Sequence, residues 1–318
     1  MEYTAVIRTL GKAGEKYQTL LDSLVSQMIP PKAIIVYIAE GYPVPAETVG
    51  IERYVYVKKG MVAQRALRYD EVETEYMLFL DDDVYLAPNS VSVLYSQLIE
   101  KNADVISPDV FDNASRPKIA GLMMTLSGRM RPRKDDGVWG YKVMRTTGYS
   151  YNSNPVKPTY FSQTNAGPCF FCKKLNFLKA RFEEELWMDD CQYALGDDQT
   201  MFYKMYCVGL KILTSYNSGI KHLDAGGNLT KEKEKILIYS DFRFKTIFWH
   251  RFIFRPEKHF FLKVWDCICI GYAFAFSILV SFFKCRFDVL KLKYSAICDG
   301  IRFIHSKEYN KIPLVKYE

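Results

Sequence analysis

Short apolar runs alternate in the first half of the chain with longer segments in which apolar residues recur every three or four positions. The short runs are typical of buried strands, and the longer segments are typical of helices with one apolar face. The predicted strands are residues 3–8, 33–38, 54–58, 76–80 and 104–107, and the predicted helices are residues 17–28, 61–69 and 90–99. This alternation predicts an α/β fold with a mostly parallel central sheet that helices cover on both faces.

The pattern is less regular over residues 108–165, which are rich in charged residues and in Tyr, Ser, Asn and Pro. This composition indicates loops and edge strands around the mouth of a site. Regular structure resumes with predicted strands at 167–171 and 211–215, and with a helix between them that ends at Gly209.

The C-terminal part, residues 226–318, has a different composition. Aromatic and cationic residues are mixed over residues 239–254, which favours a lipid headgroup interface or a phosphate-lined cleft. Residues 267–283 are apolar except for two serines. At about 1.5 Å per residue, this run barely reaches the ~30 Å thickness of a bilayer core. We expect an interfacial or re-entrant membrane helix pair; a buried core helix and a true membrane span are the alternatives.

Three adjacent carboxylates, Asp81, Asp82 and Asp83, follow the apolar run at 76–80. Neighbouring anions repel one another and need a cation, backbone N–H donors or water. Ligands of open α/β sheets bind beyond the carboxyl ends of the strands, where carboxylates hold Mg²⁺ or Mn²⁺ together with phosphate oxygens. The alternative is a solvated turn in which Asp83 or Asn89 caps the next helix.

A second pair of carboxylates, Asp197 and Asp198, stands at the start of the helix that ends at Gly209. Acidic residues commonly cap helices at this position, but one of the two can cap while the other faces a cleft. His222 follows the strand predicted at 211–215. An isolated histidine is usually a packed or surface residue, so its role depends on what lies near it.

The chain contains 43 Lys and Arg against 36 Asp and Glu, a formal net charge of +7. This excess suits an anionic ligand or anionic lipid, and it is too small to indicate nucleic acid. The first residues run directly into a strand pattern, so we expect no signal peptide and reduced cysteines. Cys169 and Cys172 are expected to pack within a strand rather than bind zinc. Gly11 and Gly14 do not have the spacing of a phosphate loop.

The order of these features resembles that of the family 2 glycosyltransferases, which have the GT-A nucleotide-sugar fold. Asp81-Asp82-Asp83 resembles the Asp-x-Asp motif of that family, and Gly196-Asp197-Asp198 resembles its Gly-Glu-Asp motif, with Asp in place of Glu. The combination is more specific than either motif alone. The resemblance implies a GT-A domain over residues 1–225 and a helical, membrane-associated region over residues 226–318.

The resemblance also implies which residues bind the nucleotide-sugar donor. Arg8 and Thr9 correspond to the first-strand residues that touch the nucleotide, and Glu40 stands where the family has an Asp that contacts the nucleobase. Gly60 and Arg65 match the Gly and Arg near the diphosphate. We therefore expect these five residues to surround the donor.

Among the acids, the resemblance assigns Asp81 to the ribose or base of the nucleotide and places Asp82 beside it in the donor site. Asp83 resembles the ligand of the Mn²⁺ or Mg²⁺ that bridges the donor diphosphate, and His222 resembles a further metal contact. Asp198 resembles the catalytic base, which takes the proton of the acceptor hydroxyl.

The predicted activity is transfer of a sugar, with inversion, from a nucleotide-sugar to the hydroxyl of a saccharide or a lipid-linked acceptor. The Gln-x-x-Arg-Trp motif of processive synthases is absent, which favours a single addition. A cytosolic donor and the C-terminal composition favour the cytoplasmic face of the plasma membrane, in biosynthesis of a bacterial surface polysaccharide. Two alternatives are a sugar nucleotidyltransferase and a non-catalytic, membrane-associated scaffold with the same fold.

Overall fold

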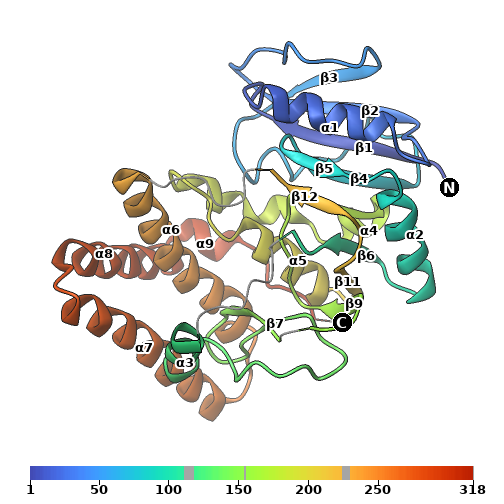
Figure 1. Ribbon diagram of the computed structural model, residues 1–318. Helices are drawn as coiled ribbons and strands as arrows, with labels where there is room; N and C mark the ends of the chain where they lie inside the picture. The colour runs from blue at the N-terminus through green and yellow to red at the C-terminus, as the bar shows by residue number, and fades with distance from the viewer. Residues whose placement is uncertain (111–117, 154, 224–229, 318) are drawn as a thin grey trace.

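The computed structural model describes residues 1–110, 118–153, 155–223 and 230–317, and it contains one large sheet flanked by helices (Figure 1). The eight strands of this sheet lie in the order β3-β2-β1-β4-β10-β6-β11-β9. They are β1 (Tyr3–Thr9), β2 (Ala33–Ala39), β3 (Glu52–Val57), β4 (Tyr76–Asp81), β6 (Val105–Pro108), β9 (Thr159–Ser162), β10 (Cys169–Lys173) and β11 (Ile212–Ser215). Six strands run in one direction, whereas β9 and β10 run the opposite way.

The predicted mostly parallel α/β sheet is confirmed, and each predicted strand is present with its ends within two residues. Helices α1 (Glu15–Val25) and α2 (Ser90–Glu100) pack on one face of the sheet. Helices α4 (Lys174–Lys179) and α5 (Asp197–Cys207) pack on the other. Because both faces are covered, β2 and β4 are buried along nearly their whole length, as their continuous apolar sequences require.

The region predicted as loops and edge strands contains more regular structure than expected. It holds α3 (Lys118–Leu126) and the strand pair β7 (Tyr141–Val143) and β8 (Ser150–Asn152), and β9 forms an edge of the large sheet as predicted. Nearer the predicted site, β5 (Val84–Leu86) pairs with β12 (Ile220–His222) in a second small sheet.

The helix predicted over residues 61–69 is wrong, because these residues form turns. Backbone bonds from Gln64 to Gly60 and from Ala66 to Val62 make about one helical turn and no more. Tyr69 then adopts a left-handed backbone conformation with φ of 56°, which ends helical continuation. The apolar spacing is real, but those side chains pack into the sheet core from an irregular segment.

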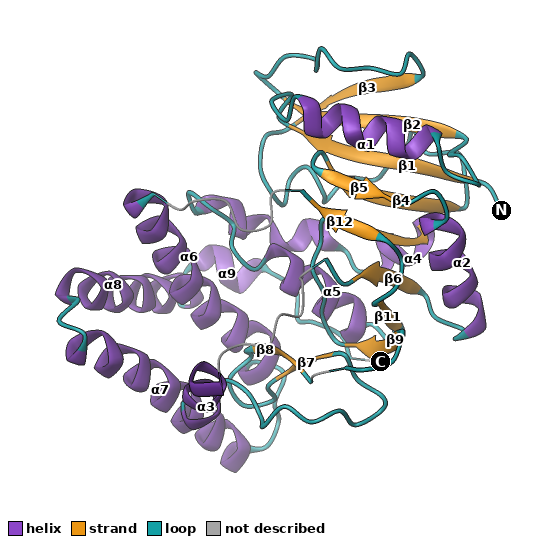
Figure 2. Ribbon diagram, in the orientation of Figure 1, coloured by secondary structure: helices purple, strands orange, loops and turns teal. Residues whose placement is uncertain are grey.

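The C-terminal helices form a layer beside the sheet (Figure 2). They are α6 (Lys231–Trp249), which continues into the π-helical turn η2 (His250–Phe254), α7 (Phe260–Phe283), α8 (Phe287–Ile304) and α9 (Lys307–Lys311). Ile247, Phe248 and Phe252 belong to the same apolar core as β1, β4 and α5. The sheet and the first of these helices are therefore held together by shared hydrophobic contacts.

Helix α7 begins seven residues before the apolar run that the sequence marks at 267–283. Its 24 residues correspond to about 36 Å at the rise of an α-helix. Among the helices of the described residues, it alone has the length and apolar composition needed to cross a membrane, with a mean hydropathy of 1.9. Only 28% of the 18-residue stretch of α7 to which this hydropathy applies is buried inside the protein.

Candidate active site

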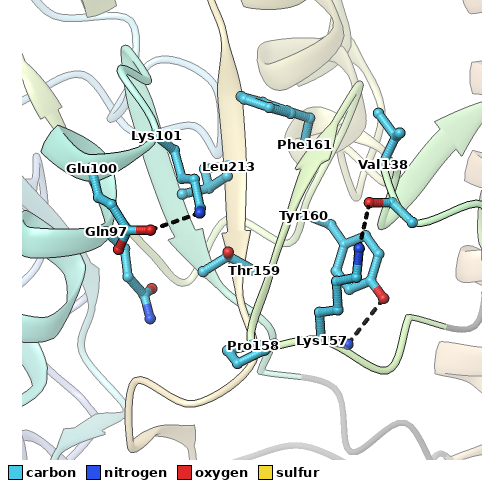
Figure 3. A pocket seen from close by; sticks show the side chains of 11 residues that line it. Gln97, Glu100, Lys101, Val138, Lys157, Pro158, Thr159, Tyr160, Phe161 and Leu213 are labelled. Carbon is cyan, nitrogen blue, oxygen red and sulfur yellow. Dashed lines mark hydrogen bonds and ion pairs between the residues drawn. The ribbon is translucent and has the colours of Figure 1, made fainter.

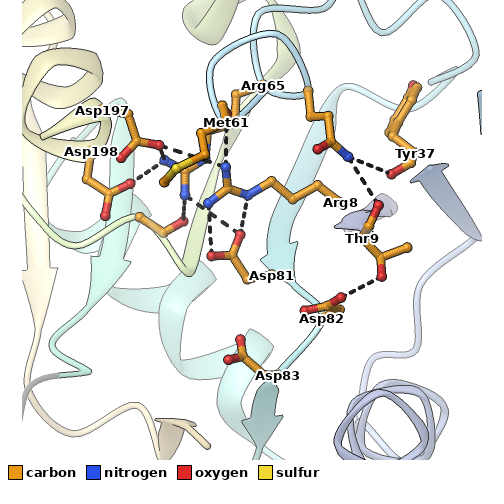
Figure 4. Close-up of polar contacts among 12 residues, drawn as sticks. Arg8, Thr9, Tyr37, Met61, Arg65, Asp81, Asp82, Asp83, Asp197 and Asp198 are labelled. Atoms are coloured by element: carbon orange, nitrogen blue, oxygen red, sulfur yellow. Dashed lines mark hydrogen bonds and ion pairs between the residues drawn. The ribbon is translucent and has the colours of Figure 1, made fainter. Parts of the chain in front are cut away.

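The predicted site residues meet where β1 and β4 end, because these neighbouring parallel strands have their carboxyl ends at the same edge of the sheet. The register places Arg8 beside Asp81. The Arg8 guanidinium donates through Nε and Nη2 to the two carboxylate oxygens of Asp81, the second contact being 3.0 Å, and through Nη1 to the Met61 carbonyl at 3.0 Å (Figure 4). Arg8 therefore makes a bidentate ion pair at the centre of the site.

Arg65 joins this pair to the second acid motif. Its Nη1 donates to Asp197 Oδ2 at 2.7 Å and to Asp198 Oδ1, and its Nη2 lies 3.7 Å from Asp81 Oδ1 (Figure 4). The guanidinium also donates to the Gly167 carbonyl at 3.0 Å. We call Arg8, Arg65, Asp81, Asp197 and Asp198 the sheet-edge cluster. The two acid motifs, far apart in sequence, thus meet through one buried arginine.

Two glycines make room for this arrangement. A Cβ on Gly167 would lie 2.1 Å from Asp198 Oδ1, so a larger residue would push the carboxylate away from Arg65. Gly196 has a φ of 91°, and a Cβ there would meet the Phe244 ring of α6 at 2.2 Å. The glycine before the Asp197-Asp198 pair is therefore required both by the turn into α5 and by the packing of α6.

Asp189 holds the turn that carries Arg65, a role that the sequence analysis missed. It lies in the 3₁₀-helix η1 (Phe182–Asp190), and its carboxylate accepts the backbone N–H groups of Val62 at 3.0 Å and Ala63 at 2.8 Å. A Cβ on Gly60 would lie 2.2 Å from Asp189 Oδ2, which explains the glycine at that position. The only signal in the sequence was a further acid pair, Asp189-Asp190, without a recognisable motif.

Asp82 turns away from the arginines and accepts a hydrogen bond from the Thr9 hydroxyl. Burial raises the pKa of Asp82 to about 6, and the neighbouring Asp81 and Asp83 carboxylates act in the same direction. Burial, followed by the adjacent Asp198 carboxylate, likewise raises the pKa of Asp197. Two of the site carboxylates thus gain affinity for a proton because burial removes the water that would stabilise their charge and neighbouring carboxylates repel it.

Asp83 and His222 come together although their elements are far apart in the chain. His222 ends β12, whose pairing with β5 brings its Nε2 to 3.0 Å from Asp83 Oδ2. This carboxylate and imidazole could serve as two protein ligands for Mn²⁺ or Mg²⁺, which commonly complete their coordination with phosphate oxygens and water. Within the described residues, no group of three or more His, Cys, Asp or Glu side chains is arranged to hold a metal by itself.

The charge balance also fits a cation that arrives with an anionic ligand. This region contains two arginines, Arg8 and Arg65, and five carboxylates, those of Asp81, Asp82, Asp83, Asp197 and Asp198. A diphosphate would add negative charge to a site that already has an excess of it, unless a metal ion came with it. The residues present therefore fit a divalent ion beside Asp83.

Glu40 is not a member of the sheet-edge cluster. It follows β2, is exposed, and its backbone N–H donates to the Val57 carbonyl at 2.8 Å. The nearby Tyr42 ring lies under the ammonium groups of Lys12 and Lys59, at 4.9 and 5.0 Å from the ring centroid. Glu40 and Tyr42 thus follow the carboxyl end of β2, the strand that lies on the other side of β1 from β4.

A cavity of about 430 Å³ lies apart from the sheet-edge cluster, between α2, β9 and β11 (Figure 3). Its charged side chains are already partnered: Lys101 pairs with Glu100 at 2.7 Å, and Lys157 donates to the Gly137 carbonyl at 3.2 Å. None of the predicted site residues lines this cavity. Its size alone therefore does not make it the candidate active site.

No protein-family model matches the sequence, and no curated protein is significantly similar to it. The structure is similar to that of S. aureus TarS 1-349 in complex with UDP-GlcNAc, with a TM-score of 0.50 and 13% identity, covering 95% of this chain and 81% of that one. The structure of GalNAc-T7 with UDP, GalNAc and Mn²⁺ has a TM-score of 0.49 and 12% identity. That match covers 86% of this chain, which spans 56% of the GalNAc-T7 chain.

The likeness to TarS identifies the fold. The chain has a GT-A-like α/β fold with a large, mostly parallel sheet and an apolar C-terminal helix, as the sequence predicts. At this level of identity the likeness says nothing about individual residues, so the roles assigned to the sheet-edge cluster depend on its own geometry.

Proposed function

We propose that this protein is an inverting, non-processive glycosyltransferase of the family 2 type, which transfers a sugar from a nucleotide-sugar to an acceptor hydroxyl. The observation that carries the proposal is the meeting of Arg8, Arg65 and two acid motifs at the carboxyl edge of a GT-A-like sheet. Departure of a nucleoside diphosphate needs positive charge, and attack by a hydroxyl needs a base. This edge of the sheet offers both.

Arg8 and Arg65 are suited to hold the donor diphosphate, since guanidinium groups bind phosphate oxygens in bidentate fashion. Asp83 and His222 would hold Mn²⁺ or Mg²⁺, which when bound would neutralise charge on the leaving group. In the structure, both arginines are paired with carboxylates. We infer that diphosphate binding draws Arg65 away from Asp198.

Asp198 is the better candidate for the catalytic base. Its side chain is 32% exposed, whereas that of Asp197 is 6% exposed and remains against Arg65 and Arg8. An acceptor hydroxyl can therefore reach Asp198 more easily. Release of Asp198 from Arg65 would free its carboxylate to take the proton as the hydroxyl attacks the anomeric carbon.

Thermal stabilisation by a panel of UDP-, GDP-, CMP- and dTDP-sugars, with and without Mn²⁺, tests donor binding. One nucleotide is expected to stabilise the protein only with metal, and that donor should then release nucleoside diphosphate. Asp83→Ala should abolish the release while keeping the fold. Full activity in excess EDTA would refute metal dependence, and binding without any release would favour the scaffold alternative.

We further propose that α7 lies on the cytoplasmic face of the plasma membrane and brings the site to a lipid-linked or lipid-proximal acceptor. Helix α7 exposes many apolar residues. Six of them form one stripe at helical spacing: Phe261, Trp265, Ile268, Tyr272, Leu279 and Phe283. Its buried side combines the apolar residues Ile270, Ala273 and Phe274 with three polar ones. These are Asp266, paired with Arg145, and Ser277 and Ser281, which accept hydrogen bonds from Lys293.

An exposed apolar stripe of this length is unfavourable in water and favourable in a lipid interface. Four cationic residues are exposed around the ends of α7 and α8, where they suit an anionic leaflet: Lys258, Lys284, Arg286 and Lys291.

Sedimentation of the full-length protein with anionic vesicles tests this attachment. The double substitution Phe261→Ser and Phe283→Ser should release the protein, whereas Met28→Ser and Leu175→Ser, also at exposed apolar residues, should not. A wild-type protein that stays monodisperse without detergent and ignores vesicles would refute the attachment.

A further inference from the structure

A second group of buried polar side chains lies between the sheet-edge cluster and α7. Within the described residues, the Nε of Arg129 and the hydroxyl of Tyr149 are buried and have no hydrogen-bond partner. The Tyr149 side chain is largely enclosed, with the residue 7% exposed. Buried donors without acceptors are costly, and their presence in a native fold indicates a missing partner.

Lys245 of α6 completes this group. Its Nζ lies 4.9 Å from the centroid of the Tyr149 ring, and the Arg129 Cζ lies 5.3 Å from the same centroid. Lys245 is 8% exposed and makes one hydrogen bond among the described residues, to Gln199 Oε1 at 2.6 Å. Burial lowers the pKa of Lys245 to about 8, and Arg129 acts in the same direction. Two cations therefore share one tyrosine ring.

The described carboxylate that acts on this group is that of Asp241, which is half-buried. Lys293 of α8 is also close enough to Arg129 and Asp241 for their charges to act on it. Three positive charges against one negative charge leave an excess of two. The bonding capacity of the group is likewise one-sided, because Arg129, Tyr149 and Lys245 all offer donors.

This group is related by position to both the candidate base, Asp198, and the proposed membrane helix, α7. Gln199, which binds Lys245, directly follows Asp198 in α5 and also donates to the Gly148 carbonyl at 2.7 Å. On the other side, Arg129 follows α3, whose Leu126 carbonyl accepts a hydrogen bond from Tyr272 of α7 at 2.7 Å. The group therefore lies between the candidate base and the helix with the apolar stripe.

We propose that Arg129, Tyr149 and Lys245 form a binding site for a phosphate or diphosphate group through which the acceptor is attached to a lipid. This inference rests on the proposed function for the meaning of the word acceptor, but anion binding itself does not require it. A phosphate oxygen would accept from all three side chains and balance the excess charge. The lipid chain would then extend toward the apolar surface of α3 and α7, while the reacting hydroxyl would lie near Asp198.

The test measures binding of three probes to full-length protein in detergent by calorimetry: farnesyl phosphate, inorganic phosphate and farnesol. Farnesyl phosphate is expected to bind more tightly than inorganic phosphate. Arg129→Gln should weaken both phosphate probes by about tenfold or more, because a charged hydrogen bond is lost, and should leave farnesol unaffected. Arg131→Gln is the matched control, since Arg131 is exposed in the same segment and carries the same charge.

A second variant, Tyr149→Phe, removes only the unpartnered hydroxyl. It should keep or raise the melting temperature of the free protein and weaken farnesyl phosphate several-fold. Unchanged binding in both Arg129→Gln and Tyr149→Phe would overturn the site, as would an equal loss in Arg131→Gln. Equal affinity for inorganic and farnesyl phosphate would overturn the link to a lipid. None of these measurements uses a donor, so failure of the donor panel and failure of this site are separate results.

Discussion

Two groups of charged side chains, each of which includes residues of α5, differ in charge balance and in exposure. The sheet-edge cluster holds two arginines against three carboxylates, with Arg8 18%, Asp81 21% and Asp198 32% exposed. The second group, which we call the inner ion-pair network, consists of Glu184, Glu185, Lys204 and Arg251. It holds two cations against two anions, and its side chains are at most 9% exposed.

The inner ion-pair network is closed. Arg251 donates to both Glu185 oxygens and, at 3.0 Å, to the Pro313 carbonyl, while Trp187 donates to Glu185 at 2.8 Å. Lys204 donates to the Arg181 carbonyl at 2.7 Å as well as to the glutamates. The inner ion-pair network joins η1, α5, η2 and the C-terminal segment, and its polar groups have no hydrogen-bonding capacity left for a ligand. The sheet-edge cluster has unbalanced acids and an exposed side, so it can exchange partners with one.

The largest expected effect separates two of the three aspartates of the sheet-edge cluster, Asp197 and Asp198. Asp198→Asn should lower transfer by about 10²–10⁴-fold with donor affinity retained, because the proton acceptor is lost and the donor contacts remain. Donor titration and transfer rates on the same preparation measure the two effects. If Asp197→Asn were inactive and Asp198→Asn active, the assignment of the base within the pair would be wrong.

Breaking the inner ion-pair network should reduce stability rather than chemistry. Arg251→Met leaves Glu185 buried without its main partner, and should cost about 3–5 kcal/mol in the free energy of unfolding. Thermal and urea denaturation give the change. Lys32→Ala removes an exposed pair with Glu2 and should hardly change the free energy of unfolding. Similar losses in both variants would show that burial does not distinguish the pairs.

Removing an acid from the site should increase stability, in contrast to the loss expected for Arg251→Met. The pKa of Asp82, about 6 in the folded protein, lies above its ordinary value of 3.8. The folded state therefore holds the proton more tightly, and the free energy of unfolding falls as pH rises from about 4 through 6. Asp82→Asn, which cannot ionise, should be more stable than wild type by about 2–3 kcal/mol at pH 7 in EDTA.

This gain should vanish below pH 4, where the wild-type carboxyl is protonated in both states. Asp70→Asn, at a largely exposed side chain, is the control and should show little pH-dependent difference. A destabilised Asp82→Asn at pH 7 would mean that the ionised carboxylate is favourably bound in the folded protein.

The smallest effect concerns Asp189, which links the two regions by holding the Arg65 turn from η1. Asp189→Ala removes a carboxylate that accepts two backbone N–H groups, and should cost about 1–2 kcal/mol of stability. Because Arg65 would lose its fixed position, donor affinity should fall as well. Asp190→Ala, at the exposed neighbouring residue, should change neither quantity. Unchanged donor affinity in Asp189→Ala would show that the turn needs no support from η1.

The sequence by itself was sufficient for the sheet and for the location of the acids. Short continuous apolar runs that alternate with amphipathic helices favour strands of a sheet covered on both faces, and parallel strands end at one edge. Arg8 and Asp81 were therefore expected at the same edge of the sheet, whereas the pairing of β1 with β4 that makes them neighbours was decided by the strand order. The Asp197-Asp198 pair was likewise visible as a helix start after a glycine.

Tertiary structure alone decided which partners those side chains have. Arg65 reaches its position because Asp189, 126 residues away from Ala63, holds the turn that carries it. His222 meets Asp83 only through the pairing of β12 with β5, and Arg129, Tyr149 and Lys245 meet across segments with no common pattern. The outward direction of the apolar stripe on α7 also depends on Arg145 and Lys293, which bind its polar side. The periodicity of apolar residues depends on the local secondary structure of the chain. Hydrogen bonds and ion pairs, in contrast, form between whichever groups the fold brings within a few ångströms of one another.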